Sequence, residues 1–286
     1  MNGANKSPNM KSDLALICLC LFLGCTTHAF GQEAPLTAAS GQAADTDPLN
    51  RPADLHPLGT QATSGFAYAV NAGVASNYIF RGVDQTRGGV EGFAGADLTY
   101  KQVYAGALTS NVDFSAFGDR RTYDETDLYT GWRPSFEGFN LDLGAIYYGY
   151  LGQAGNLDYV EGYLKIARSI GPLTAQTAIY ASPNYPGSAN GGYYAEGKLA
   201  YVVTPKLTLS AVIGHKQVEL TRSYAGCASQ SCLRANGATY TTWDLGAAYA
   251  VTDNLSLDLR YWDTDKHSYG SAFSDKVVIS ARVAFP

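Results

Sequence analysis

The chain has 286 residues, a formal net charge of −5 and a mean hydropathy close to neutral. Its basic residues are scattered and form no cluster interleaved with aromatics, which excludes the usual patterns of nucleic-acid binding. No apolar run after residue 31 is long enough for a membrane helix, so a helical membrane protein is excluded as well.

The first 31 residues have the layout of a secretory signal peptide. The apolar run Leu14–Cys25 follows two lysines, and cleavage fits after Ala29 or Gly31. At this length the run is too short to cross a bilayer as a helix. The sequence therefore predicts export from the cytoplasm, with residues 1–31 as the signal peptide.

Two alternatives stay open at this end of the chain. Met10 also begins a signal of ordinary length, and the segment before Cys25 loosely resembles a lipoprotein cleavage site. Residues 32–64 hold four prolines and no periodic apolar pattern, which predicts a flexible periplasmic lead-in. Residues 65–286 are predicted to form one domain.

Beyond this lead-in the sequence is a series of short segments with apolar residues at every second position. Leu141–Ala145, Leu207–Ala211 and Leu255–Leu259 show the pattern most clearly. Successive side chains of a strand point to opposite faces, so this period predicts strands with one apolar and one polar face. Turn residues divide the region into these predicted strands: Phe66–Arg81, Glu91–Tyr100, Val103–Phe114, Glu125–Arg133, Phe139–Leu151, Asp158–Ile170, Leu173–Ser182, Tyr193–Val203, Leu207–Leu220, Thr239–Val251, Leu255–Asp265 and Asp275–Phe285.

The joints between these strands alternate between long polar loops and tight turns. Tight turns such as Lys101-Gln102 and Gly171-Pro172 alternate with loops such as 82–90 and 221–238. This alternation is typical of transmembrane β-barrels with short periplasmic turns and long extracellular loops. We therefore predict an all-β fold, an antiparallel transmembrane β-barrel of about twelve strands in the bacterial outer membrane. A soluble β-sandwich or lipocalin-like barrel also has alternating strands, but the length of these strands favours the membrane.

Aromatic residues gather at the ends of the predicted strands. Tyr147–Tyr150, Tyr193-Tyr194 and Tyr261-Trp262 fit the aromatic girdles at the two membrane interfaces. The last strand ends in Phe285, and a terminal aromatic residue resembles the signal that the outer-membrane assembly machinery reads. Outer-membrane lipid and this machinery are therefore the predicted partners of the barrel.

Two of the five cysteines lie after the signal region. Cys227 and Cys232 stand in one Gly/Ser-rich loop, where an oxidising compartment favours a disulfide. A metal pair is the alternative, but no histidine or carboxylate stands near enough in the sequence to complete a site. No cofactor and no metal are predicted.

The polar face of each strand is predicted to line the barrel lumen, because a cationic side chain facing lipid at the membrane centre costs about 2–4 kcal/mol. The charges nearly balance, which predicts at most a weak preference for cations. The same charges would act as interior struts if they paired and closed the barrel. Arg81 is singled out as either a selectivity residue or an anchor of the first loop. The predicted lumen residues are Asn71, Asn77, Arg81, Asp97, Asp127, Asp142, Glu161, Lys165, Gln176, Glu196, Lys198, Lys216, Asp244, Asp258, Arg260, Lys276 and Arg282.

An enzymatic function is not predicted. Some twelve-stranded barrels are lipid hydrolases, and a hydrolase needs its nucleophile and base within hydrogen-bond reach. His215 and Ser210 fall on opposite faces of one predicted strand, and His267-Ser268 stands in a loop. A lipid hydrolase therefore stays a remote alternative. A non-conducting structural or adhesin-like barrel, with the Cys227–Cys232 loop as its contact surface, is a nearer one.

Several segments resemble the TorF-type porin family, which carries the Gcw_chp domain. The most distinctive is Ser76–Thr86, and Asp127–Trp132, Tyr147–Tyr150 and Trp243–Gly246 follow in the expected order. Leu151 departs from the family, in which proline is frequent after the tyrosine-rich run. The resemblance covers nearly all of the predicted barrel domain and implies a barrel with a pore, without an established substrate.

The sequence thus predicts an outer-membrane porin through which small hydrophilic solutes diffuse passively in a narrow water-filled pore. Twelve strands place the interior between those of filled eight-stranded barrels and open sixteen-stranded porins. The permeating solute, assembly into a homo-oligomer and an inward fold of one of the long loops stay open.

Overall fold

The computed structural model describes residues 65–285 apart from 154–156, 186–190 and 219–238. The predicted signal peptide, the lead-in and the Cys227–Cys232 disulfide lie outside these residues. Within the part of the chain that is described, no helix is both long and apolar enough to span a membrane.

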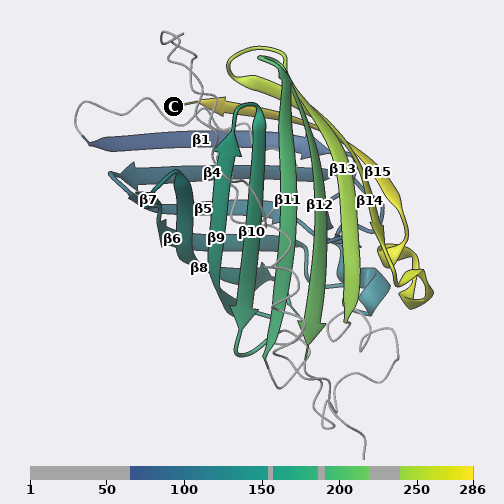
Figure 1. The fold of residues 1–286 in the computed structure, drawn as a ribbon. Helices are drawn as coiled ribbons and strands as arrows, with labels where there is room; N and C mark the ends of the chain where they lie inside the picture. The colour runs from purple at the N-terminus through teal and green to yellow at the C-terminus, as the bar shows by residue number, and fades with distance from the viewer. Residues whose placement is uncertain (1–64, 154–156, 186–190, 219–238, 286) are drawn as a thin grey trace, which may run out of the picture. The chain divides into compact units, whose positions relative to one another are not determined.

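Most strands of the described residues form one antiparallel sheet that closes on itself (Figure 1). Consecutive wall strands pair with each other, and the last returns to pair with the first. The sheet has thirteen strands, and all but the two-residue β7 (Ser135–Phe136) belong to the wall, so twelve described strands close the barrel. This confirms the predicted fold class. The wall strands are β1 (Phe66–Ala75), β4 (Glu91–Tyr100), β5 (Val103–Asn111), β6 (Asp124–Trp132), β8 (Phe139–Leu151), β9 (Tyr159–Ile170), β10 (Leu173–Ser182), β11 (Gly192–Thr204), β12 (Leu207–Val218), β13 (Tyr240–Ala250), β14 (Leu255–Thr264) and β15 (Lys276–Phe285).

Small elements lie in the loops at one end of the barrel, which we call the long-loop end. Between β1 and β4, β2 (Ile79–Phe80) and β3 (Val83–Asp84) form a separate two-stranded sheet. The 3₁₀-helix η1 (Phe114–Phe117) lies between β5 and β6, and η2 (His267–Tyr269) and η3 (Ser271–Phe273) lie between β14 and β15. The other end, where tight turns join the strands, is the tight-turn end.

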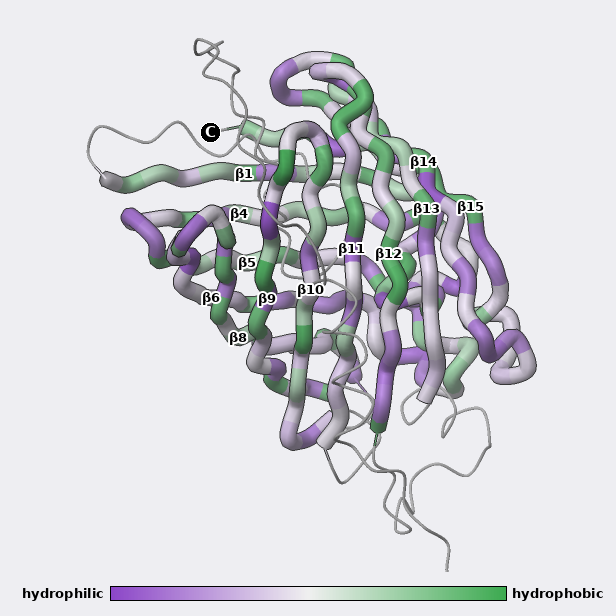
Figure 2. The backbone as a smooth tube through the Cα atoms, viewed as in Figure 1, coloured by the Kyte–Doolittle hydropathy of each residue, from purple (hydrophilic) through white to green (hydrophobic). Residues whose placement is uncertain are grey.

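The wall has an apolar outer face and a polar inner face. Large apolar side chains such as Leu128, Leu199 and Val277 are exposed on the outside. Hydrophobic and hydrophilic positions alternate along the strands, as Figure 2 shows. A continuous band of exposed apolar side chains is unfavourable in water and matches the tails of membrane lipids. The two-residue period of the sequence therefore builds a wall suited to a bilayer.

The strand boundaries differ from the predicted ones at two places. The predicted strand Phe66–Arg81 ends at Ala75, and the predicted Val103–Phe114 ends at Asn111. After Ala75 the chain leaves the wall, although the Ser76 N–H still donates to the carbonyl oxygen of Ile279 (2.9 Å). The other boundaries agree within two residues, as far as the described residues extend.

The barrel closes at the seam between β1 and β15, where Gly73 brings two backbones together. A Cβ atom at Gly73 would lie 2.6 Å from the carbonyl oxygen of Ala281 and would overlap the ring of Phe93. Only hydrogen fits at this position without a shift of the backbone.

We expect Gly73→Ala to lower the free energy of unfolding by about 1–3 kcal/mol, the usual cost of overpacking. Urea unfolding of the protein in lipid vesicles, followed by tryptophan fluorescence, measures the effect. Gly197→Ala is the matched control, because a Cβ at this strand glycine meets nothing within 4 Å. Equal stability of the two variants would contradict a tightly packed seam.

Candidate functional site: the barrel lumen and its inward hairpin

The predicted lumen residues lie on the buried inner face. All of them are buried except Asp97, Lys198 and Lys276, which are partly buried. Their role in lining a channel stays a prediction, because burial alone does not measure a flow of solute. The prediction that Asn77 and Arg81 belong to the first wall strand is wrong, because β1 ends before both residues.

Arg81 lies at the tip of a hairpin that the first long loop forms. β2 and β3 pair as Ile79 with Asp84 and Phe80 with Val83, which leaves Arg81 and Gly82 as a two-residue turn. Both turn residues have positive φ, 51° at Arg81 and 81° at Gly82, as a type I′ turn requires. We call residues 79–84 the lumen hairpin.

The Arg81 side chain makes the strongest contact of the lumen hairpin. Its two terminal nitrogens donate to the two carboxylate oxygens of Glu161 on β9, at 2.9 and 2.8 Å. Both side chains are almost completely buried, at 2% and 0% exposed. A two-pronged pair of this kind is stronger and more specific than a single hydrogen bond. It ties the tip of a loop to the wall, and Glu161 lies 80 residues further along the chain.

Aromatic rings surround the same guanidinium. Its central carbon lies 4.7 Å from the ring centroid of Phe80 and 4.6 Å from those of Tyr180 and Tyr194. A cation over an aromatic face is favourable, more so where water is excluded. These contacts compensate for an arginine in a backbone conformation that residues other than glycine rarely adopt.

Further contacts hold the lumen hairpin across the barrel. A Cβ atom at Gly82 would overlap the Thr242 side chain of β13 and would lie 2.9 Å from Cγ2 of Thr264 on β14. Val83 packs in an apolar cluster with Tyr240 and Phe273. The lumen hairpin therefore meets β13 and β14, which follow β15 on one side of β1, as well as β9 further around the wall.

The base of the lumen hairpin is fixed by hydrogen bonds. The Tyr78 hydroxyl donates to Glu125 on β6 at 2.6 Å. The Thr86 hydroxyl donates to the side-chain oxygen of Asn77 (2.7 Å), and the N–H of Asp113 donates to the carbonyl oxygen of Gln85 (2.8 Å). Asn77 and Thr86 therefore close the loop below its tip, so Asn77 has a structural role in the first loop.

Tyrosines fill the space around the Arg81–Glu161 pair. Tyr148 and Tyr159 stack with centroids 4.4 Å apart, and Tyr148 donates from its hydroxyl to Glu161 (3.1 Å). Tyr180 and Tyr194 follow on the neighbouring strands, with centroids 6.1 Å apart. All four side chains are buried. The lumen at this level is packed with side chains.

A second charged network lies on β12, β13 and β14. The Arg260 guanidinium donates to Asp244, to Oδ2 of Asp258 (3.1 Å) and to Oγ of Ser210 (3.1 Å). Gly246 makes room for it, because a Cβ there would overlap the guanidinium. The alternation of residues along the strands puts these groups on one face of the wall. The register of β12, β13 and β14 then brings them into contact.

A third network lies toward the tight-turn end. The Tyr104 hydroxyl donates to Oδ1 of Asp142 (2.7 Å) and lies against the Tyr163 hydroxyl. Arg133 pairs with Oδ2 of Asp142 (3.2 Å), and its guanidinium covers the Tyr104 ring at 3.6 Å. Arg133 was not among the predicted lumen residues, although it ends the predicted strand Glu125–Arg133 and has the same parity as Asp127.

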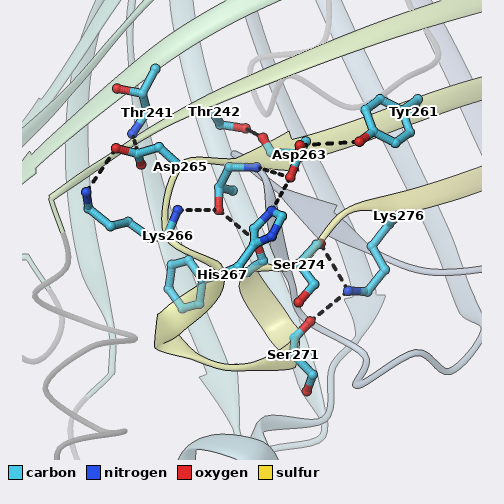
Figure 3. A network of polar contacts seen from close by, with 12 residues as sticks. Thr241, Thr242, Tyr261, Asp263, Asp265, Lys266, His267, Ser271, Ser274 and Lys276 are labelled. Atoms are coloured by element: carbon cyan, nitrogen blue, oxygen red, sulfur yellow. Dashed lines mark hydrogen bonds and ion pairs between the residues drawn. The ribbon is translucent and has the colours of Figure 1, made fainter.

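The loop between β14 and β15 carries a polar network at the long-loop end, shown in Figure 3. His267 contacts Oδ1 of Asp263 through Nε2 (2.5 Å), and the Tyr261 hydroxyl donates to the other oxygen of Asp263 (3.3 Å). Partial burial raises the pKa of Asp265, but the N–H of Thr241 and the Lys266 amine outweigh this effect. The pKa of Asp265 therefore lies below its usual value. Ion pairs and loop carbonyls thus order this loop.

His215 and Ser210, both on β12, have different partners. Nδ1 of His215 contacts the Thr241 hydroxyl at 3.1 Å. Ser210 instead accepts from Arg260 on the inner face. His215 and Ser210 are therefore separated by the wall, as the sequence predicted.

A closed sheet with exposed apolar side chains outside and charged residues inside defines the class of this protein. It is a transmembrane β-barrel of the bacterial outer membrane. The chain belongs to the family described as "Bacterial protein of unknown function (Gcw_chp)", whose model matches residues 59–284. This confirms the resemblance that the sequence motifs indicated.

Solved structures share the barrel fold. The KdgM porin is similar with a TM-score of 0.52 and 8% sequence identity, covering 76% of this chain and 99% of that chain. The NanC porin has a TM-score of 0.47 at 10% identity, with 76% and 98% covered. The COG4313 outer membrane channel from Pseudomonas putida F1 has a TM-score of 0.45 at 12% identity, with 80% and 96% covered. No curated protein matches the chain.

Proposed function

We propose that this barrel is a channel for the passive diffusion of small hydrophilic solutes across the outer membrane, narrowed by the lumen hairpin. The proposal rests on one observation, namely which part of the chain supplies the side chains that fill the lumen. Arg81, which is buried in it, comes from a loop and not from the wall. The wall itself presents charged and polar side chains inward, such as Lys198, Asp244 and Arg260. A wall of this kind suits water and ions once the loop moves aside.

A second candidate function is a closed structural barrel. The burial of Arg81, Glu161 and the surrounding tyrosines favours it, because these side chains leave little space at their level. The two candidates differ in one physical property. In a channel the lumen hairpin leaves its place often enough for solute to pass, whereas in a structural barrel it stays.

Liposome swelling tests the proposed channel with neutral solutes. Vesicles with the refolded protein are diluted into isotonic glycine, arabinose or stachyose, and swelling is followed by light scattering. We expect rapid swelling in glycine, slower swelling in arabinose and none in stachyose, because a narrow channel selects by size. Swelling no faster than that of empty vesicles, with the protein shown to be folded, would favour the structural barrel.

Phe285 is proposed as part of the signal for assembly into the membrane. It is half exposed on the outer face and lies opposite Val70 at the seam. We expect Phe285→Ser to reduce the amount of folded protein in the outer membrane of expressing cells, measured by gel mobility without heating. Val283→Ser, a polar change on the same face, is the control for loss of apolar area alone. Equal losses in the two variants would remove the special role of the terminal aromatic residue.

A further inference from the structure

Lys216 is a buried lysine that forms no ion pair within the described part of the chain. It lies on β12, on the inner face, and only 6% of its side chain is exposed. Its amine lies 4.3 Å from the ring centroid of Tyr185 and 5.6 Å from that of Tyr240. Aromatic faces stabilise an ammonium group, but they supply neither a full negative charge nor strong acceptors for its three N–H donors.

Arg81 lies beside Lys216. The Arg81 guanidinium covers the ring of Tyr194, and Tyr194 is the direct cross-strand neighbour of Lys216. The positive charge of Arg81 also acts on the Tyr185 hydroxyl, and the Lys216 amine lies over the Tyr185 ring. Two cationic groups therefore meet around one tyrosine at the tip of the lumen hairpin.

The carboxylate in this cluster is already engaged. Glu161 uses both of its oxygens for Arg81, and one of them also accepts from Tyr148. Burial raises the pKa of the Tyr185 hydroxyl to about 12, so this hydroxyl is neutral at physiological pH and balances no charge. Two basic side chains thus lie beside one carboxylate that is already hydrogen-bonded, an arrangement that is costly in a site shielded from water.

We propose that Lys216 and Arg81 form a binding site for the carboxylate of a small solute at the lumen hairpin. An incoming carboxylate supplies a further negative charge and hydrogen-bond acceptors, and the tyrosine rings move apart to pack against the rest of the solute. The site gives the lumen at the level of this hairpin a preference for anions, opposite to the weak cation preference that the overall lumen charges predict. This inference rests on the proposed function, because the solute reaches the site through the proposed channel.

Calorimetric titration of the detergent-solubilised, folded protein tests this site without any current. Potassium gluconate is the ligand, and glucose is its neutral analogue. We expect wild type to bind gluconate and not glucose. Lys216→Met should weaken gluconate binding by about tenfold or more, the usual effect of removing one member of a buried charge pair. Lys216→Arg keeps the charge and is expected to retain most of the binding.

Lys206→Met is the matched control, because it removes the same charge from an exposed turn. It should bind gluconate as wild type does. Wild type that fails to bind gluconate would overturn the site, and so would a folded Lys216→Met protein with unchanged affinity. If Lys216→Met does not fold, loss of binding in Arg81→Gln and its retention in Lys216→Arg make the same distinction. Gluconate binding by a barrel that passes no solute would sustain this site and contradict the channel function.

Discussion

Gly82→Ala is expected to raise the single-channel conductance of the barrel severalfold. The turn of the lumen hairpin needs a positive φ at this residue, and an added methyl group would overlap Thr242. The lumen hairpin would then lose its place against β13 and β14, and the Arg81–Glu161 pair would separate. Recordings in planar lipid bilayers at a fixed voltage measure the change.

Gly88→Ala separates this effect from backbone strain. Gly88 lies in the same loop with a similar φ of 78°, but a Cβ there meets nothing within 4 Å. Both variants carry the cost of an alanine at positive φ, and only Gly82→Ala carries the clash. We expect Gly88→Ala to conduct as wild type does. An equal increase in both variants would show that strain in the loop, and not the packing of its tip, controls the current.

Arg260→Met is expected to lower the free energy of unfolding by about 3–5 kcal/mol, the range found when one partner of a buried ion pair is removed. The change leaves the carboxylates of Asp244 and Asp258 buried without the guanidinium that both contact. Urea unfolding in lipid vesicles measures it. Arg120→Met, at an exposed arginine, is the control and should stay within about 0.5 kcal/mol of wild type.

A rescue variant identifies the cause of the loss. Replacing Asp244 and Asp258 with asparagine in the Arg260→Met protein removes both unpaired charges while it keeps the side-chain shapes. We expect this triple variant to recover a large part of the lost stability, because the buried carboxylates and not the missing contacts dominate the cost. No recovery would instead indicate that Arg260 stabilises the barrel through packing.

The wall of the barrel was predictable because its signal is local. Alternation of apolar and polar residues sets the face of each side chain, and turn residues set the boundaries. Parity alone therefore placed Asp244 and Arg260 on the same inner face. It left their pairing open, because contact across strands depends on the register of β13 with β14.

The lumen hairpin was not predicted, although one signal pointed to it. A membrane strand needs about 9–11 residues, and the predicted strand Phe66–Arg81 was longer than that. At its end, Phe80-Arg81-Gly82-Val83 has glycine and apolar neighbours suited to a two-residue turn. The inward course of this turn depends on Glu161, so only the folded chain shows it.

The central claim is that this barrel conducts and that the lumen hairpin controls the current. Single-channel recording of the refolded wild-type protein in potassium chloride, beside Gly82→Ala, tests it most directly. We predict small, discrete current steps for wild type and larger steps for Gly82→Ala. Folded protein that gives no steps in either form would contradict the claim and identify the barrel as a closed structural one.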